Sequence, residues 1–391
     1  MKRLSAIDIA RGLVMVIMAL DHTRDFLHIH AAQSPTDLQT TTPILFFTRW
    51  ITHLCAPSFV FLSGTSAWLY LNGSGTRNFL RKRGLILILL EFTLVNFALS
   101  FDIHFRLFLF EVIATIGAGL VLLSQLSRLK PGIILAIAIV LLAGHDGIAF
   151  VKMPSSPVLG FIGSLLSGPG GFPLGSGRLF VIAYPVLPWL AIMLLGFWMG
   201  PVFIRRAAAQ KRFLVRAGVA ALALFVVLRE VNVYGDPVPW KPQKNGVYTF
   251  LSFFNVTKYP PSLLFSLVTL GILLLILAVA TKGPAPTGQP AGRESAPGRI
   301  LQVYGRVPFF YFVLHLYLLH ALMLLTASWQ GHPWGEFDFS PFKFGRPPGA
   351  GVSLGAVYAI WAALVIALYP VCRWYGRYKA AHREKTWLRY L

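Results

Sequence analysis

The sequence predicts an all-α polytopic membrane protein, a bundle of about ten transmembrane helices with both termini in the cytoplasm. Hydrophobic residues make up 56% of the 391 residues, and the mean hydropathy is +0.66. Charged residues make up only 13% of the chain, against about 25% in soluble domains. Apolar stretches of about 20 residues recur along the sequence, and each is long enough to cross a bilayer.

The predicted spans follow one another with short polar or proline- and glycine-rich connections. In chain order they occupy about residues 7–27, 47–71, 85–101, 107–126, 131–150, 179–204, 213–233, 261–281, 300–326 and 352–372. Together they form a single transmembrane domain over residues 1–391. Residues 282–299 are rich in Pro, Gly and Ala, which predicts a flexible cytoplasmic linker. Residues 373–391 combine aromatic and basic residues, as is typical of an interfacial tail.

The net charge of +21 would suggest a nucleic-acid partner in a soluble protein. Here the basic residues are distributed unevenly between the two sides of the predicted spans. With the amino terminus inside, 22 of the 35 Lys and Arg residues fall on the cytoplasmic side and eight on the outer side. This distribution follows the positive-inside rule. The charge therefore indicates orientation and contact with the anionic lipids of the bilayer, and we expect no nucleic-acid partner.

The first span carries ionisable residues, each of which costs roughly 2.5–3.5 kcal/mol at the centre of a membrane helix. Arg11 and His22 are eleven residues apart, which places them on one helix face about 16 Å apart along the axis. We interpret this face as part of a reaction path. The other charges also have a structural interpretation, as a pair with Arg11 near the start of the span and a self-neutralising cluster near its end. They are Asp8, Asp21, Arg24 and Asp25.

Further polar residues lie in the outer third of other spans, at about the depth of His22. Arg49 and His53 are one helical turn apart in the second span, and His315 lies in the ninth. Polar groups that converge at one depth favour a site facing the bundle interior. A lipid-headgroup contact for Arg49 and a structural role for His53 stay open. Structural roles are favoured for Glu91, Glu111, His145 and His320.

These residues fall in three motifs that resemble a known family. The first, SAIDIARG (residues 5–12) followed by His22, resembles the opening of transmembrane acyltransferases, which carry an arginine, ten residues and a histidine. The second is RWITHLCAPSFVFLSG (residues 49–64), and the third is YGRVPFFYFVLH (residues 304–315). Together they resemble the heparan-alpha-glucosaminide N-acetyltransferase-like catalytic domain of bacterial membrane proteins. The resemblance is clearest over residues 1–72 and 300–326.

The resemblance implies an acyl-CoA-dependent N- or O-acyltransferase of the cell envelope, an integral protein of the bacterial inner (plasma) membrane. It would move an acetyl or other acyl group from cytoplasmic acetyl-CoA or another acyl-CoA. The acceptor would be an amine or hydroxyl of an extracytoplasmic glycan or small molecule. No metal is expected, and a homodimer is compatible with this class. The identity of the acceptor stays open.

Acyl transfer from a thioester needs a base for the acceptor and a stabiliser for the developing oxyanion. The candidate catalytic residues are His22, Asp21, Asp25, Arg49, His53 and His315. In this assignment His22 is the base, one of the two neighbouring aspartates orients it, and Arg49 or His53 stabilises the oxyanion. The candidate residues for the CoA phosphates are basic. They are Arg11, Arg81, Lys82, Arg83 and Arg306.

Two alternatives stay open. The eukaryotic lysosomal enzyme of the resembling family has an asparagine in place of His22, and its catalytic histidine lies further on, in the luminal loop. His28 and His30 lie near that place, so they compete with His22 for the role of base. The alternative function is a proton-coupled membrane transporter, because buried charges in many spans suit a carrier. Against it, the sequence lacks a repeated pair of broken helices.

Overall fold

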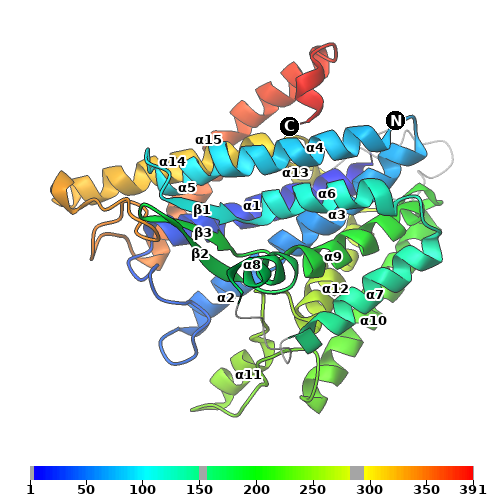
Figure 1. Cartoon of the computed structure of the whole chain (residues 1–391), viewed down its shortest axis with the longest axis horizontal. Coiled ribbons are helices and arrows are strands. Elements are labelled where there is room, and N and C mark those ends of the chain that lie inside the picture. The colour runs from blue at the N-terminus through cyan, green and yellow to red at the C-terminus, as the bar shows by residue number, and fades with distance from the viewer. Residues whose placement is uncertain (1–3, 149–155, 282–294, 391) are drawn as a thin grey trace.

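The computed structural model describes residues 4–148, 156–281 and 295–390, and the molecule is predominantly helical. The α-helices are α1 (Ser5–Leu27), α2 (Pro43–Thr52), α3 (Cys55–Asn72), α4 (Arg77–Leu90), α5 (Asn96–Ser100), α6 (Val112–Leu126), α7 (Pro131–Ile148), α8 (Pro157–Leu166), α9 (Val186–Trp198), α10 (Ala207–Val231), α11 (Gly246–Phe254), α12 (Leu263–Ala280), α13 (Ala296–Arg306), α14 (Pro308–Trp329) and α15 (Leu354–Ala381). The short π and 3₁₀ turns are η1 (Glu91–Val95), η2 (Gly200–Ile204), η3 (Trp334–Glu336) and η4 (Thr386–Arg389). In Figure 1 the loops after α1 and α14 lie at one end of the molecule, and both labelled chain ends lie toward the other. We refer to these as the loop end and the terminal end.

Within the described residues, six helical segments are long and apolar enough to cross a membrane. They are Pro43–Asn72, Arg77–Ser100, Val186–Ile204, Leu263–Ala280, Pro308–Trp329 and Leu354–Ala381. The helices α6 and α7 are apolar but shorter, and α1 and α10 carry more charged residues. A helix therefore lies at each of the ten predicted spans. How many of these helices cross the bilayer, and in which direction, stays a prediction.

Two of the predicted spans are broken helices. The second span consists of α2 and α3, which are separated at His53 and Leu54. The ninth consists of α13 and α14, which are separated at Val307. Pro308 begins α14, where its missing N–H and fixed φ suit the first helical position. The same residue cannot continue the preceding helix, so α13 ends just before it.

A three-stranded sheet departs from the all-α prediction. Strand β1 (Leu107–Phe110) pairs in parallel with β3 (Arg178–Ile182), and β2 (Gly170–Gly175) pairs antiparallel with β3. The predicted spans 107–126 and 179–204 therefore each begin as a strand before the helix starts. The run Leu-Phe-Leu-Phe of β1 is too short for its periodicity to separate a strand from a helix. Its partner strand lies far along the chain, so only the fold reveals the pairing.

The first helix lies at the centre of the bundle and packs against α2, α3, α12, α13, α14 and α15. Its crossing with α13 brings the two backbones together at Gly12 and Gly305. A Cβ on Gly12 would lie 1.8 Å from the carbonyl oxygen of Leu301, and one on Gly305 would lie 1.9 Å from that of Asp8. Only glycine allows this approach. The crossing therefore joins the first motif to the third.

The structure differs from the prediction at the linker before α13 and at the tail after the last predicted span. Residues 282–294 of the predicted linker lie outside the described residues, and the remainder reaches into the first turn of α13. The helix α15 continues past the predicted span end at residue 372 to Ala381, and η4 follows it. Leu388 of η4 is buried in the hydrophobic core. The tail therefore packs on the bundle, and its place at a lipid interface stays a prediction.

Candidate active site

A cavity of about 350 Å³ lies at the terminal end of the bundle. Its walls come from α1, α3, α4, α6, α13 and α14, together with the C-terminal segment. The basic side chains that line it are Arg11, Arg83, Arg306, Lys379 and Arg389. Among the described residues of its lining none is acidic, and most of the others are apolar. Such a cavity suits a ligand with an anionic end and a long, weakly polar arm.

One face of α1 connects this cavity to the histidine predicted as the base. Arg11, Met15 and Met18 line the cavity at spacings of four and three residues. His22 follows four residues after Met18 on the same face. The ring of His22 meets Phe312, another lining residue, edge-on with a centroid separation of 6.0 Å. The predicted common face of Arg11 and His22 is therefore present, and the cavity follows it from the arginine to the neighbourhood of the imidazole.

His22 forms a hydrogen-bonded pair with His315 of α14. The Nδ1 atom of His22 lies 2.8 Å from Nε2 of His315, and Nδ1 of His315 lies 2.8 Å from the carbonyl oxygen of Tyr311. A carbonyl only accepts, so a neutral His315 carries its proton on Nδ1 and accepts with Nε2. His22 then donates from Nδ1 and keeps its lone pair on Nε2. His315 is fully buried and His22 is partly exposed, so the pair presents one basic nitrogen from a rigid support.

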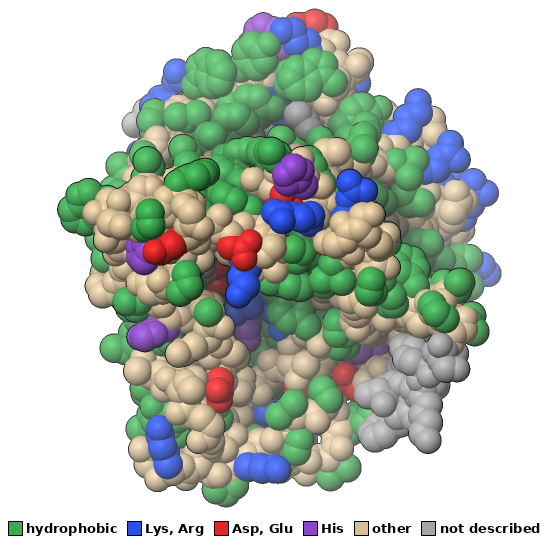
Figure 2. Space-filling model, turned by 60° about the vertical axis from the view of Figure 1, so that its left-hand side comes forward, with side chains coloured by type: hydrophobic (Ala, Val, Ile, Leu, Met, Phe, Trp, Pro, Cys, Tyr) green, Lys and Arg blue, Asp and Glu red, His purple; other side chains and the backbone are tan. Residues whose placement is uncertain are grey.

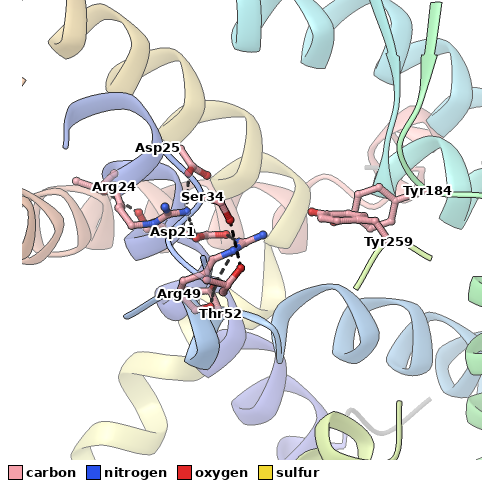
Figure 3. Close-up of polar contacts among 11 residues, drawn as sticks. Asp21, Arg24, Asp25, Ser34, Arg49, Thr52, Tyr184 and Tyr259 are labelled. Atoms are coloured by element: carbon pink, nitrogen blue, oxygen red, sulfur yellow. Dashed lines mark hydrogen bonds and ion pairs between the residues drawn. The ribbon is translucent and has the colours of Figure 1, made fainter. Parts of the chain in front are cut away.

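A network of ion pairs lies one helical position from His22. Asp21 accepts from Arg24 at 2.9 Å and from Arg49 of α2, and Arg24 also donates to Asp25 at 2.6 Å. Arg49 in addition donates to the hydroxyl of Thr52 at 3.3 Å. Figure 3 shows these side chains converging between α1 and α2. His22 is hydrogen-bonded to His315, and the two carboxylates predicted as candidates to orient it pair with arginines. Arg49, a candidate oxyanion stabiliser, pairs with Asp21, and the catalytic roles of these residues stay predictions.

The loop end of the site contains residues that the sequence did not single out. Lys258, from the loop before α12, interacts electrostatically with Asp21, His22 and His53. Its Nζ lies 4.9 Å from the ring centroid of Tyr259, whose hydroxyl is 3.4 Å from that of Tyr184. The two tyrosines lie beside the ion-pair network in Figure 3. Figure 2 shows basic, acidic and histidine side chains gathered around the centre of the loop-end face.

His53 lies where α2 ends and α3 begins. Its side chain is buried against Phe265, with ring centroids 5.5 Å apart. Within the described part of the chain, its Nδ1 has no hydrogen-bond partner. The charges of Arg49, Lys258 and Asp21 act on it. His53 is therefore buried near the ion-pair network, and its chemical role stays a prediction.

The five basic residues predicted to bind CoA separate into two groups. Arg11 donates to the carbonyl of Gly305 at 3.3 Å and to the hydroxyl of Ser66 at 3.0 Å, and it lies beside the cavity with Arg83 and Arg306. The Nε of Arg83 is buried, and no atom in the described part of the chain accepts its hydrogen. Arg81 and Lys82 are exposed and lie outside the cavity lining. The C-terminal segment supplies the other two lining cations, Lys379 and Arg389, which the sequence did not single out for this site.

Three of the four residues expected to be structural make packing contacts, and the role of Glu111 stays a prediction. His320 faces away from His22, bonds the carbonyl of Ala98 at 3.0 Å and stacks on Phe101 with a centroid separation of 3.9 Å. His145 bonds backbone carbonyls of its own helix. Glu91 accepts from the backbone N–H of Ala114 in the first turn of α6 at 2.8 Å. These contacts agree with roles in helix packing.

The competing histidines His28 and His30 lie beyond the end of α1 at the loop end. His28 forms a backbone bridge with Val352, and its ring lies 5.6 Å from that of His30. Burial lowers the pKa of His28, and the charges of His30, Arg24 and Arg346 lower it further. Neither histidine lines the cavity described above. His22 does not line the cavity either, but its ring contacts the lining residue Phe312.

Comparison with known protein families places these features in a wider group. Residues 3–229, more than half of the chain, match the family model described as heparan-alpha-glucosaminide N-acetyltransferase, catalytic. The matched part contains α1, both halves of the second motif and most of the cavity. No curated protein matches the chain.

Proposed function

Because the chain belongs to the family of heparan-alpha-glucosaminide N-acetyltransferase catalytic domains, we propose that it transfers an acetyl group from cytoplasmic acetyl-CoA to an acceptor on the far side of the membrane. The membership makes the protein an integral membrane acetyltransferase. The observation that carries the finer proposal is the cavity, which has basic side chains at the terminal end and approaches His22 along one face of α1. In this proposal the terminal end is cytoplasmic.

The donor would lie along the α1 face. The basic residues at the terminal end suit the phosphates of CoA, because guanidinium groups bind phosphate oxygens through charge-assisted hydrogen bonds. The apolar lining between Met15 and Phe312 suits the weakly polar pantetheine arm. This placement brings the thioester toward His22. The acceptor would reach the same nitrogen from the loop end, past Lys258 and the paired tyrosines.

The reaction needs one proton carrier at the thioester. Nε2 of His22 would take the proton of the acceptor amine or hydroxyl as that group attacks the thioester carbonyl carbon. The carbon–sulfur bond then breaks, and the CoA thiolate leaves with the proton that the imidazolium returns. His315 acts as a positioning residue, because its acceptor nitrogen holds His22 in the tautomer with Nε2 free. A route through an acetyl-histidine uses the same nitrogen as nucleophile, and a burst of CoA release without acceptor distinguishes it.

The test uses purified protein with labelled acetyl-CoA and a panel of amine and sugar acceptors. We expect His22→Ala to lower transfer by about 10²–10⁴-fold, while acetyl-CoA still raises the unfolding temperature of the variant. His30→Ala is the matched control, because His30 is exposed and lies outside the cavity lining. Undiminished transfer by His22→Ala, or loss of transfer in the control alone, would assign the base to the loop histidines.

The same preparation tests the transporter alternative. Accumulation of substrate in liposomes without acetyl-CoA would support a carrier, and absence of any acetyl-CoA effect on thermal stability would contradict the donor site. The bacterial plasma membrane as location, the homodimer and the choice between N- and O-transfer stay predictions.

A further inference from the structure

Two basic side chains at the loop end act electrostatically on His22, and they differ in their own partners. Both Lys258 and Arg49 have this effect on the imidazole. Arg49 forms an ion pair with Asp21. Lys258 has no carboxylate oxygen within 4.0 Å among the described residues, and it acts on Asp21 from beyond that distance. The ammonium group of Lys258 can therefore bind a further negatively charged group.

The loop that carries Lys258 is held on both sides by one carboxylate. Asp236 accepts hydrogen bonds from the backbone N–H and the hydroxyl of Thr257, at 2.8 and 2.9 Å, and from the hydroxyl of Ser262 at 2.7 Å. The N–H of Ser262 also donates to the carbonyl of Thr257 at 3.0 Å, which closes the loop. Because Ser262 is the N-cap of α12, the backbone of Lys258 is fixed relative to that helix.

Two aromatic rings hold the ammonium group itself. The Nζ atom of Lys258 lies 4.9 Å from the ring centroid of Tyr259 and 5.8 Å from that of Tyr184. Tyr184 is buried and packs on Trp189 with ring centroids 4.9 Å apart. In Figure 3 the hydroxyl end of this tyrosine pair points toward the ion-pair network. Aromatic faces attract an ammonium group without neutralising it, so Lys258 keeps its positive charge in a defined place.

This place lies between the histidine pair and one wall of the cavity. The charge of Lys258 acts on His22 of α1 and on Glu111, the N-cap of α6. The two residues that follow Glu111, Val112 and Ile113, line the cavity. The ammonium group is therefore within electrostatic reach of both helices that lead to the thioester end of the proposed donor site.

The proposed reaction needs a positive group at this end, because attack on a thioester places negative charge on the carbonyl oxygen. His22 serves as the proton carrier in the proposal and does not provide that group. The two residues that the sequence analysis considered for it have other surroundings, since Arg49 is ion-paired and His53 is buried. Lys258 combines a positive charge, three rotatable N–H donors and a fixed loop. An oxyanion is stabilised best by donors that are already in place.

We propose that Lys258 is a catalytic residue that stabilises the oxyanion of the acetyl thioester. The inference rests on the proposed function, since it takes the thioester to lie beside His22. As the acceptor nitrogen or oxygen bonds to the carbonyl carbon, its proton passes to Nε2 of His22. The carbonyl electron pair moves to the oxygen, which accepts a hydrogen bond from the ammonium group. The pair then returns, the carbon–sulfur bond breaks, and the CoA thiolate takes the proton from the imidazolium. Lys258 stays protonated throughout.

The experiment measures steady-state kinetics of the full-length protein with acetyl-CoA and its best acceptor. Lys258→Met keeps the apolar stem and removes the charge and the donors. We expect kcat to fall about 10²–10³-fold, the scale of one oxyanion donor. The KM for the acceptor and the stabilisation by acetyl-CoA in thermal unfolding should stay unchanged, because the lost contact forms only in the transition state. Lys258→Arg restores a charged donor and should recover part of kcat.

Lys244→Met is the matched control, because Lys244 is an exposed loop-end lysine whose Nζ also lies over a tyrosine, 3.8 Å from the ring centroid of Tyr248. It should keep the native kcat. Should Lys258→Met unfold at a lower temperature than the native protein, Lys258→Gln takes its place, since it retains a neutral donor and should show a smaller loss of kcat.

Two results would overturn the assignment while the proposed function stands. Native kcat in Lys258→Met would show that the ammonium group does not act on the transition state. A raised KM for the acceptor with native kcat would make Lys258 an acceptor-binding residue instead. If the native protein transfers acetyl from acetyl-CoA to no acceptor, the proposed function itself fails.

Discussion

The two ends of the α1 face differ in how their charges are balanced. At the loop end, Asp21 lies between Arg24 and Arg49, and Asp25 also pairs with Arg24. At the terminal end, five basic side chains line a cavity, and Asp8 lies 3.6 Å from Arg11 and 3.8 Å from Arg306. Among the described residues of the lining itself, the charged side chains are all basic. The loop-end charges pair with one another, whereas in the proposed function the terminal-end charges bind an anionic ligand.

In the proposed function, this difference separates residues that join the helices from residues that bind a substrate. A balanced network joins α1 to α2 and gains nothing from a ligand. Neighbouring basic side chains repel one another until an anion binds among them. Such a group contributes more to ligand binding than to the stability of the fold. The histidine pair lies between the two groups. Substitutions in the loop-end network, in the histidine pair and among the cavity cations should therefore change different quantities. These are stability, turnover and binding of the donor.

The largest effect is expected from breaking the balanced network. Arg49→Ala leaves Asp21 with one partner fewer in a buried site, and breaking such a pair costs about 3–5 kcal/mol. We expect a large drop in the unfolding temperature of the detergent-solubilised protein. Lys241→Ala, which removes an exposed loop-end cation, should leave that temperature unchanged.

The double variant Arg49→Met with Asp21→Asn sharpens this test. Removing both charges takes away the uncompensated carboxylate, so the double variant should recover part of the loss. A stable Arg49→Ala protein with impaired turnover would instead make Arg49 the oxyanion stabiliser that the sequence analysis predicted.

The next effect concerns the histidine pair. His315→Phe keeps a ring in place but removes the acceptor for Nδ1 of His22, and we expect kcat to fall on the order of 10²-fold. His315→Gln restores an acceptor oxygen and should recover part of that rate. The KM for acetyl-CoA should change in neither variant, because His315 does not line the cavity. Equal rates for the Phe and Gln variants would show that the hydrogen bond does not position the base.

A smaller effect is expected among the basic residues that line the cavity. Arg83→Met keeps the apolar stem but removes the charge, and we expect about tenfold weaker binding of acetyl-CoA. Stability should stay level or rise, since the buried Nε of Arg83 has no acceptor in the described structure. Arg81→Met is the matched control, an exposed cation two residues earlier on the same helix. A destabilised Arg83→Met protein with native affinity would place Arg83 among the structural charges.

The sequence predicted the local features of this site well. Helical geometry alone placed Arg11 and His22 on one face and paired Asp8 with Arg11. Each of these relations joins residues within eleven positions of one another. They depend on the helix period, which the sequence shows directly.

Relations between distant segments were not predictable in the same way. His22 and His315 were both candidates, but the hydrogen bond between them joins residues 293 positions apart. It follows from the α1–α13 crossing and the break at Pro308. The strand at Leu107–Phe110 depends on a partner beyond α7, and the tail reaches the cavity through its packing on the bundle, α4 included. Asp21 and Asp25 were predicted to orient the base because they are near it in sequence. In the folded chain both carboxylates pair with arginines, and whether either also orients His22 stays a prediction.

The smallest effect is expected beyond the balanced network, at His28. Burial, followed by the charges of His30, Arg24 and Arg346, lowers the pKa of His28 in the folded protein. As the pH falls through the unfolded value of 6.5, the unfolded chain takes up a proton that the folded chain excludes, so stability falls with it. Thermal unfolding between pH 5 and pH 8 should show this slope, and His28→Gln should flatten it by about 2 °C or less. His30→Gln is the control, because it removes an exposed neighbouring imidazole. An unchanged slope in His28→Gln would show that the bridge to Val352, and not the buried ring, determines the stability of this loop.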